Sequence, residues 1–249
     1  MIKEAPVARG KPADYGQEIV KRRSRLTTAR VELKGKTVLD FGSGNGAQTV
    51  EFVDTGCRIV AVDIDRQDLE ELSSYLKSQD ISTILPVRYD GGRLPICDTS
   101  VDVVVSYEVL EHVQYESEAL YEIHRVLKPG GEFVISVPNK AWVFETHGAY
   151  LPLLPWNRVP FFSWLPRGIH RRFAKARIYR KSQIVQLMEL HSFEVLEAVY
   201  ITAPMDVAKP QWLKQLLRTT IFHGDVTAVP FLATAILVHA KKGVRNPHG

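Results

Sequence analysis

Apolar and polar residues alternate along residues 37–240 with two different periods. Short runs rich in valine, isoleucine and phenylalanine predict β-strands, and segments with apolar residues three and four apart predict helices between them. Because strands and helices take turns, the pattern predicts a mostly parallel α/β sheet. The expected strands lie at residues 37–41, 58–63, 84–89, 101–106, 132–137, 195–201 and 233–240, and the expected helices at 47–54, 66–79, 117–127, 181–190 and 210–219.

Two segments differ from this regular pattern. Residues 14–30 predict a basic amphipathic helix that would lie over a ligand pocket, so we expect residues 1–36 to form an N-terminal helical segment and residues 37–249 one domain. Residues 139–180, between the fifth strand and the next helix, break the alternation and are rich in proline and aromatic residues. We expect them to form a lid insertion on the substrate side.

The most informative segment is residues 38–46, with the sequence VLDFGSGNG. Its apolar residues predict a buried strand, and its glycines predict a turn with the positive φ angles that side chains disfavour. Backbone N–H groups of the turn and of a helix starting near Ala47 would face a bound ligand. The same spacing satisfies the G-x-G-x-x-G/A pattern of dinucleotide-binding domains, so it indicates two classes of cofactor site. The glycines are Gly42, Gly44 and Gly46.

The segments that follow this turn separate the two classes. They are VAVDID at residues 60–65, YDG at 89–91, EVLEHV at 108–113 and LKPGG at 127–131. A nicotinamide-dependent dehydrogenase would explain the glycines and Asp63, but not EVLEHV or LKPGG. Taken together, the segments resemble the class I S-adenosylmethionine-dependent methyltransferases, in particular the group with a Leu-Glu-His motif after the fourth strand. The resemblance implies a doubly wound, Rossmann-like, seven-stranded and mostly parallel sheet with helices on both faces.

The resemblance also implies S-adenosyl-L-methionine as the cofactor and gives roles to single residues. Asp63 would accept hydrogen bonds from both ribose hydroxyls, as an acid does in other ribose pockets. Asp90 would receive the adenine amino group, and Gly91 would allow the backbone to approach closely. Asp40 would lie near the positively charged methionyl part. Backbone contacts to the methionine amino group would come from Ser106 and Tyr107.

Candidate chemistry for the acceptor follows the fourth strand. Methyl transfer requires an aligned acceptor, exclusion of water and removal of a proton. His112 has a suitable ordinary pKa for the base, with Glu111 beside it, and in relatives that methylate hydroxyl groups a histidine here serves as base. Glu108, Glu111 and His112 would share one face of a helical turn, so a divalent metal site is an alternative. His147, in the predicted lid, is the second candidate for the catalytic base.

The predicted lid bears on the nature of the acceptor. Residues 151–165 are apolar and aromatic, their prolines exclude a spanning helix, and residues 167–181 carry seven lysines and arginines with no acid. This order fits a hydrophobic lid beside an anion site, or peripheral membrane contact through residues 151–181. A nucleic acid is less favoured as the partner. A platform for single strands interleaves aromatic residues with cations, whereas here the apolar and the basic residues form separate blocks.

Composition adds limits on the class of protein. A length of 249 residues, with 45% hydrophobic and 24% charged residues, is typical of one globular domain. The net charge of +4 and a pI near 9.0 favour an anionic partner. Neither a secretory signal nor a membrane-spanning run is predicted. Cys57 and Cys97 lack metal or redox spacing and indicate reduced thiols in a cytoplasmic protein.

We therefore expect a cytoplasmic S-adenosylmethionine-dependent methyltransferase. O-methylation of a small, lipid-like or saccharide-bearing acceptor is the favoured activity. The alternatives are an RNA methyltransferase and an S-adenosylmethionine-binding regulatory protein without transfer activity.

Overall fold

The computed structural model describes residues 17–143, 161–165, 176–206 and 210–244. Its helices are α1 (Gln17–Thr28), α2 (Arg66–Ser78), α3 (Glu116–Val126), α5 (Lys181–Leu190) and α6 (Gln211–Thr219), and three short 3₁₀ helices are η1 (Thr49–Thr55), η2 (Phe162–Trp164) and η3 (Pro230–Leu232). Its strands are β1 (Thr37–Phe41), β2 (Arg58–Asp63), β3 (Ile84–Arg88), β4 (Val101–Tyr107), β5 (Leu127–Pro138), β6 (Phe193–Thr202), β7 (Val226–Thr227) and β8 (Ala233–Lys242).

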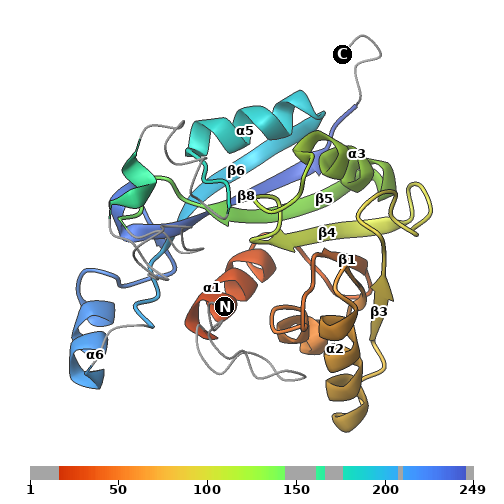
Figure 1. The fold of residues 1–249 in the computed structure, drawn as a ribbon, viewed down its shortest axis with the longest axis horizontal. Coiled ribbons are helices and arrows are strands. Elements are labelled where there is room, and N and C mark those ends of the chain that lie inside the picture. Colours follow the sequence, from red (N-terminus) through yellow and green to blue (C-terminus); the bar gives the residue numbers. More distant parts are fainter. Residues whose placement is uncertain (1–16, 144–160, 166–175, 207–209, 245–249) are drawn as a thin grey trace, which may run out of the picture.

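The strands form one twisted sheet in the order β3-β2-β1-β4-β5-β8-β6-β7 (Figure 1). The pairs from β3 to β5 are parallel, whereas β8 pairs antiparallel with β5 and β6. The predicted doubly wound, mostly parallel sheet is confirmed. Eight strands replace the expected seven because Val226 and Thr227 pair with the end of β6, and a two-residue strand leaves no periodic pattern in the sequence.

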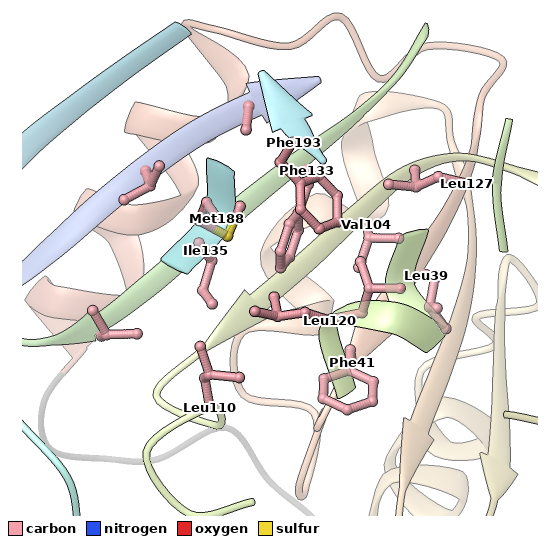
Figure 2. Packing of buried hydrophobic residues seen from close by; sticks show 14 of the residues in the cluster. Leu39, Phe41, Val104, Leu110, Leu120, Leu127, Phe133, Ile135, Met188 and Phe193 are labelled. Carbon is pink, nitrogen blue, oxygen red and sulfur yellow. The ribbon is translucent and has the colours of Figure 1, made fainter. Parts of the chain in front are cut away.

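Helices cover both faces of the sheet, each over its own apolar core. On one face, α3 and α5 bury Leu120, Ile123 and Met188 against β4, β5 and β8. Figure 2 shows Met188 beside Phe133 and Phe193, whose ring centroids are 5.3 Å apart. Each fully buried side chain of this size contributes about 1.5–3 kcal/mol. The cofactor-motif strands are therefore held from both sides.

The opposite face is covered by α1, η1 and α2. Leu26, Phe52 and Leu72 are their buried contributions to the second core. Leu69, Leu72 and Leu76 of α2 are three and four residues apart, so they share one face of that helix, and all three are buried. The spacing that predicted this helix is thus the spacing that packs it.

Two predicted element boundaries are wrong. The helix expected at residues 47–54 is the 3₁₀ helix η1, which begins only at Thr49, because residues 42–48 are occupied by turns. The β-branched residues that follow disfavour a regular α-helix. The strand expected from residue 132 begins at Leu127, which already pairs with Val101. A register shift then accommodates residues 128–131, where Gly130 has a φ of 70°.

An irregular region, here called the annex, lies beyond the carboxyl ends of β5 and β6. It comprises residues 139–143, 161–165, 203–206 and 210–232, and its small core is formed by Trp142, Ala203 and Phe222. Asn139 Nδ2 ties it together by donating to the carbonyls of Pro230 and Ala233, at 2.8 Å each. α6 lies at its periphery (Figure 1).

No helix within the described ranges is both long and apolar enough to cross a membrane. The remainder of the predicted lid, including residues 144–160 and 166–175, lies outside the described residues. Its described parts go to two places: residues 161–165 join the annex, and residues 176–180 run beside the end of β5, where Asn139 bridges Tyr179.

Candidate functional site

The glycine turn has the backbone conformation that the sequence predicts. Gly42, Gly44 and Gly46 have φ angles of 81°, 51° and 82°. A Cβ atom at Gly42 would overlap the side chain of Val109, and one at Gly46 would overlap Leu72. Glycine is therefore required at both places by conformation and by packing together.

Asp63 joins this turn to the end of β2. Its Oδ2 accepts a hydrogen bond from the Gly44 N–H at 2.7 Å, and its Oδ1 accepts from the Asp65 N–H at 2.9 Å. A carboxylate oxygen accepts up to two hydrogen bonds, so each oxygen retains capacity for a ligand hydroxyl. The arrangement supports a ribose site.

Asp40 lies beneath the same turn and is buried. Its Oδ2 accepts from the Thr49 hydroxyl at 2.6 Å. Burial raises the pKa of this carboxyl to about 7, the Thr49 hydrogen bond lowers it in part, and the charge of Asp63 raises it further. A cation bound nearby would stabilise the ionised carboxylate, which suits a residue expected close to the methionyl part.

The end of β3 borders two hollows. Asp90 Oδ1 accepts from the Gly92 N–H at 3.0 Å, and Gly91 has a φ of 89°. A cleft of about 180 Å³ is lined by Phe41, Tyr89, Gly91 and the segment 113–115, and a more open hollow of about 410 Å³ includes Asp90. Asp90 and Gly91 thus lie at a concave surface, where a base could be seated.

The end of β4 connects the site to α1. Ser106 is buried, and its hydroxyl donates to the Phe41 carbonyl at 3.1 Å, which fixes the neighbouring ends of β1 and β4. The Tyr107 hydroxyl shares a 2.6 Å hydrogen bond with Thr27 of α1, and burial raises the pKa of Tyr107. Only the backbone of these residues was predicted to face the cofactor, and their side chains are engaged inside the fold.

The turn after β4 differs from the predicted helical turn. Glu108 has a φ of 58°, and residues 108–115 between β4 and α3 form bends and turns but no helix, so Glu108, Glu111 and His112 do not share a helical face. Glu108 faces α1, where its Oε1 lies 2.8 Å from Arg23 Nη2. Glu111 is buried, whereas the His112 side chain is 46% exposed, with its Nε2 3.9 Å from Glu111 Oε1.

The alternative of a metal site gains nothing from this arrangement. Across residues 17–143 and the other described ranges, no three histidine, cysteine or acidic side chains are grouped so that they could hold a metal ion. His147, the second candidate base, lies outside the described residues.

Two arginines for which no individual role was predicted support the site. Arg177 braces the turn after β4: its N–H donates to the Glu111 carbonyl at 3.2 Å and its Nη2 to the Gln114 carbonyl at 3.0 Å. Arg23 contacts Glu108 from helix α1. The spacing of Val20, Arg23 and Thr27 along one face of α1 was a signal that could have identified Arg23.

The residues around the turn fit the methyl-donor cofactor. Among the described residues, three buried polar atoms at this edge lack a hydrogen-bond partner, namely Arg23 Nε, Ser43 Oγ and Gln48 Oε1. Buried polar atoms are normally satisfied, so a polar ligand between α1 and the turn accounts for them. When bound there, S-adenosylmethionine supplies a methyl group activated by a positively charged sulfur, and Asp40, Asp63 and the glycine turn would hold it.

Comparison with known proteins supports S-adenosylmethionine-dependent methyl transfer as the activity. The sequence profile of a methyltransferase domain matches residues 39–135. The Mycolicibacterium smegmatis protein named "Probable S-adenosylmethionine-dependent methyltransferase" is 28% identical over 201 residues, which cover 78% of this chain and 72% of that protein. Two methyltransferases from Mycobacteroides abscessus and Mycobacterium leprae match over only 41% and 40% of their own length.

Two further relatives bear on chemistry and on fold. A ubiquinone biosynthesis O-methyltransferase of Nitrosococcus oceani is 30% identical over 145 residues, covering 55% of this chain and 56% of the relative. The solved structure of the Burkholderia thailandensis 1,6-didemethyltoxoflavin-N1-methyltransferase, with bound S-adenosylhomocysteine, has a TM-score of 0.60 at 17% identity. It covers 92% of this chain and 80% of that one, and shows the shared fold. Residues 39–135 thus form a methyltransferase domain, and the matches support membership of the class I S-adenosylmethionine-dependent methyltransferases.

Proposed function

We propose that this methyltransferase acts on a hydroxyl oxygen of a small, lipid-like or saccharide-bearing acceptor. The observation that carries the proposal is the position of Glu111 and His112. Their turn contacts the cofactor turn directly, because Val109 lies against Gly42. A partly exposed imidazole with a buried carboxylate beside it is a suitable arrangement for removing a hydroxyl proton.

In the proposed mechanism, His112 accepts the acceptor's hydroxyl proton as the oxygen takes up the methyl group. Glu111 would stabilise the imidazolium that forms, since its Oε1 lies 3.9 Å from Nε2 and its side chain is buried. Arg177 holds the backbone of this turn in place. The half-exposed imidazole would be covered by the acceptor itself, which excludes water.

A lipid-like acceptor is supported by the aromatic side chains of the annex. Phe161, Trp164 and Phe231 are 57%, 48% and 59% exposed. The ring centroid of Trp164 lies 5.2 Å from that of Phe161 and 6.0 Å from that of Phe231, so the three rings form a row. Such an exposed apolar ridge is typical of an interaction site. O-methylation is supported by the relatives named ubiquinone biosynthesis O-methyltransferase.

Peripheral membrane contact and a cytoplasmic location are part of the same proposal. The aromatic ridge, with the positive net charge of the chain, would favour an anionic membrane surface as the source of the acceptor. Sedimentation with vesicles containing anionic lipid checks this point, and vesicles of neutral lipid are the comparison. If the protein stayed in the supernatant with both, the membrane part of the proposal would be wrong.

The decisive experiment is transfer of a labelled methyl group into fractionated lipid, small-molecule and RNA pools. We expect label in the lipid or small-molecule pool. Label in RNA alone would favour the RNA methyltransferase instead, and no transfer despite cofactor binding would favour the regulatory protein.

The catalytic base is tested with His112→Ala, which should lower the rate about 10²- to 10⁴-fold. His191→Ala is the matched control, because His191 lies at the end of α5, where its Nδ1 shares a 2.8 Å hydrogen bond with the Leu187 carbonyl. Full activity of His112→Ala would refute the base assignment. Activity that disappears on chelation and returns with a divalent ion would revive the metal alternative.

A further inference from the structure

The helix α1 brings a guanidinium to the methionyl end of the cofactor site. We propose that Arg23 binds the carboxylate of the cofactor's amino-acid part and thereby positions that end of the ligand. The inference rests on the cofactor assignment and not on the identity of the acceptor.

One stripe of α1 faces the carboxyl edge of the sheet. The Val20 carbonyl accepts from Gln48 Nε2 at 3.1 Å, just after the glycine turn, and Thr27 bonds to Tyr107 at the end of β4. Arg23 lies between these two residues on the same helical face, at spacings of three and four. In Figure 1, α1 accordingly lies next to the end of β4. The helix thus spans the gap between the β1 turn and β4.

The contacts of Arg23 leave one of its buried donors without a partner in the described part of the chain. Its side chain is only 12% exposed, and Nη2 is held 2.8 Å from Glu108 Oε1. Nε is buried and has no hydrogen-bond partner among the described residues. A guanidinium carries five N–H donors in a rigid fork that matches a carboxylate. The expected occupant is therefore an anion with oxygen acceptors.

The charges nearby indicate which anion this is. Asp40, Asp63 and Glu108 surround the site with carboxylates, which suit the sulfonium and ammonium groups of the ligand but repel its carboxylate. Ammonium and carboxylate are attached to the same carbon atom, so both must be accommodated near the end of β4. The Arg23 charge also reaches Tyr107, where it opposes the rise of the pKa caused by burial. Among the described residues around this turn, Arg23 is suited to offset that repulsion.

Calorimetric binding of two ligands tests the proposal. S-adenosylhomocysteine carries the carboxylate, and its decarboxylated analogue differs only by lacking it. A charge-assisted hydrogen bond corresponds to about a 10- to 150-fold change in affinity. In Arg23→Met we expect the affinity for S-adenosylhomocysteine to fall by a factor in this range and the affinity for the analogue to stay unchanged.

Two variants serve as controls. Arg25→Met changes an arginine of the same helix that bonds to Glu18 and Asp225, away from the ligand, and should leave both affinities unchanged. Arg23→Lys keeps the positive charge but not the planar fork of donors, so its affinity for S-adenosylhomocysteine should fall less than that of Arg23→Met.

The ratio of the two affinities decides the outcome. Equal weakening of both ligands in Arg23→Met would mean that Arg23 only supports α1, and an unchanged S-adenosylhomocysteine affinity would mean that its donor serves another group. Either result overturns the proposal. Label found only in RNA would overturn the proposed acceptor and leave this binding test unaffected.

Discussion

The cofactor edge of the sheet and the annex lie side by side but are built in different ways. At the cofactor edge, each important residue lies at or just after the carboxyl end of a parallel strand. Short hydrogen bonds fix its side chain or backbone, as between the Gly44 N–H and Asp63 and between the Thr49 hydroxyl and Asp40. In the annex, a small core around Trp142 supports loops and the peripheral helix α6, and several large apolar side chains face solvent.

This difference shows where the molecule can vary at low cost. Where the backbone itself must contact a cofactor, few residues other than glycine fit the turn, and few other than acids fit the strand ends. A surface that recognises an apolar acceptor needs only apolar side chains on a stable support, so many sequences satisfy it. Four substitutions test this contrast, two at the cofactor edge, one at the link between the regions and one in the annex.

The first prediction concerns the cost of burying Asp40. Its pKa in the folded chain, about 7, lies above its ordinary value of 3.8, so the folded state binds the proton more tightly. The stabilisation that this provides is complete below about pH 4 and is lost as the pH rises through 7, with a maximum of about 4 kcal/mol. Asp40→Asn should therefore gain in stability relative to the unmodified chain between pH 4 and pH 8.

Denaturant unfolding of both proteins across this pH range measures the effect. The same series with bound S-adenosylmethionine should show a smaller difference, because a cation nearby favours the ionised carboxylate. A stability difference that does not change with pH would show that Asp40 is ionised throughout.

The second prediction concerns Gly42, where conformation and packing coincide. Gly42→Ala places a Cβ against Val109 at a φ of 81°, so we expect a loss of about 3 kcal/mol in unfolding free energy and loss of measurable cofactor binding. Gly130→Ala is the matched control, since its φ is 70° but nothing lies within 4 Å of the added atom. Its unfolding free energy should fall by only about 1 kcal/mol, and it should bind the cofactor normally. Equal losses in both variants would remove the packing argument.

The contrast also explains which features the sequence could predict. The mostly parallel α/β sheet and the positive φ of the glycines follow from local patterns in the sequence, and they were predicted correctly. The helix after Gly46 was predicted in the wrong form, since the pattern does not reveal that Thr49 is drawn to Asp40 across the turn.

Long-range contacts account for the other differences. Arg177 lies 66 positions after Glu111 in the chain, and Arg23 lies 85 positions before Glu108, so no local period connects either pair. The shared face expected for Glu108, Glu111 and His112 failed for a different reason, because Glu108 adopts a left-handed φ that only the fold imposes.

The third prediction concerns Arg22, which links α1 to the annex. Its guanidinium is buried, with Nη1 2.8 Å from the Thr202 carbonyl and Nη2 3.4 Å from the Phe222 carbonyl. Arg22→Met keeps the apolar stem but leaves these carbonyls without their donor, so we expect a loss of about 2 kcal/mol in unfolding free energy. Lys21→Met, an exposed neighbour on the same helix, should change stability by less than about 0.5 kcal/mol. Hydrogen exchange would show the loss at the annex amides, and uniform exchange across the sheet would contradict the link.

The smallest effect on stability is expected for Phe231, which is 59% exposed at the end of the aromatic ridge. Phe231→Ser removes an apolar contact with Trp164 at 6.0 Å between ring centroids, yet exposed positions of this kind change the unfolding free energy by only about 0.5 kcal/mol. If the ridge recognises an apolar acceptor, the same substitution should raise the KM for that acceptor and leave the affinity for S-adenosylhomocysteine unchanged. Leu85→Ser, at an equally exposed leucine of the edge strand β3, controls for a general loss of apolar surface and should alter neither quantity. An unchanged KM in Phe231→Ser would separate the ridge from acceptor recognition, and the two regions would then differ in packing alone.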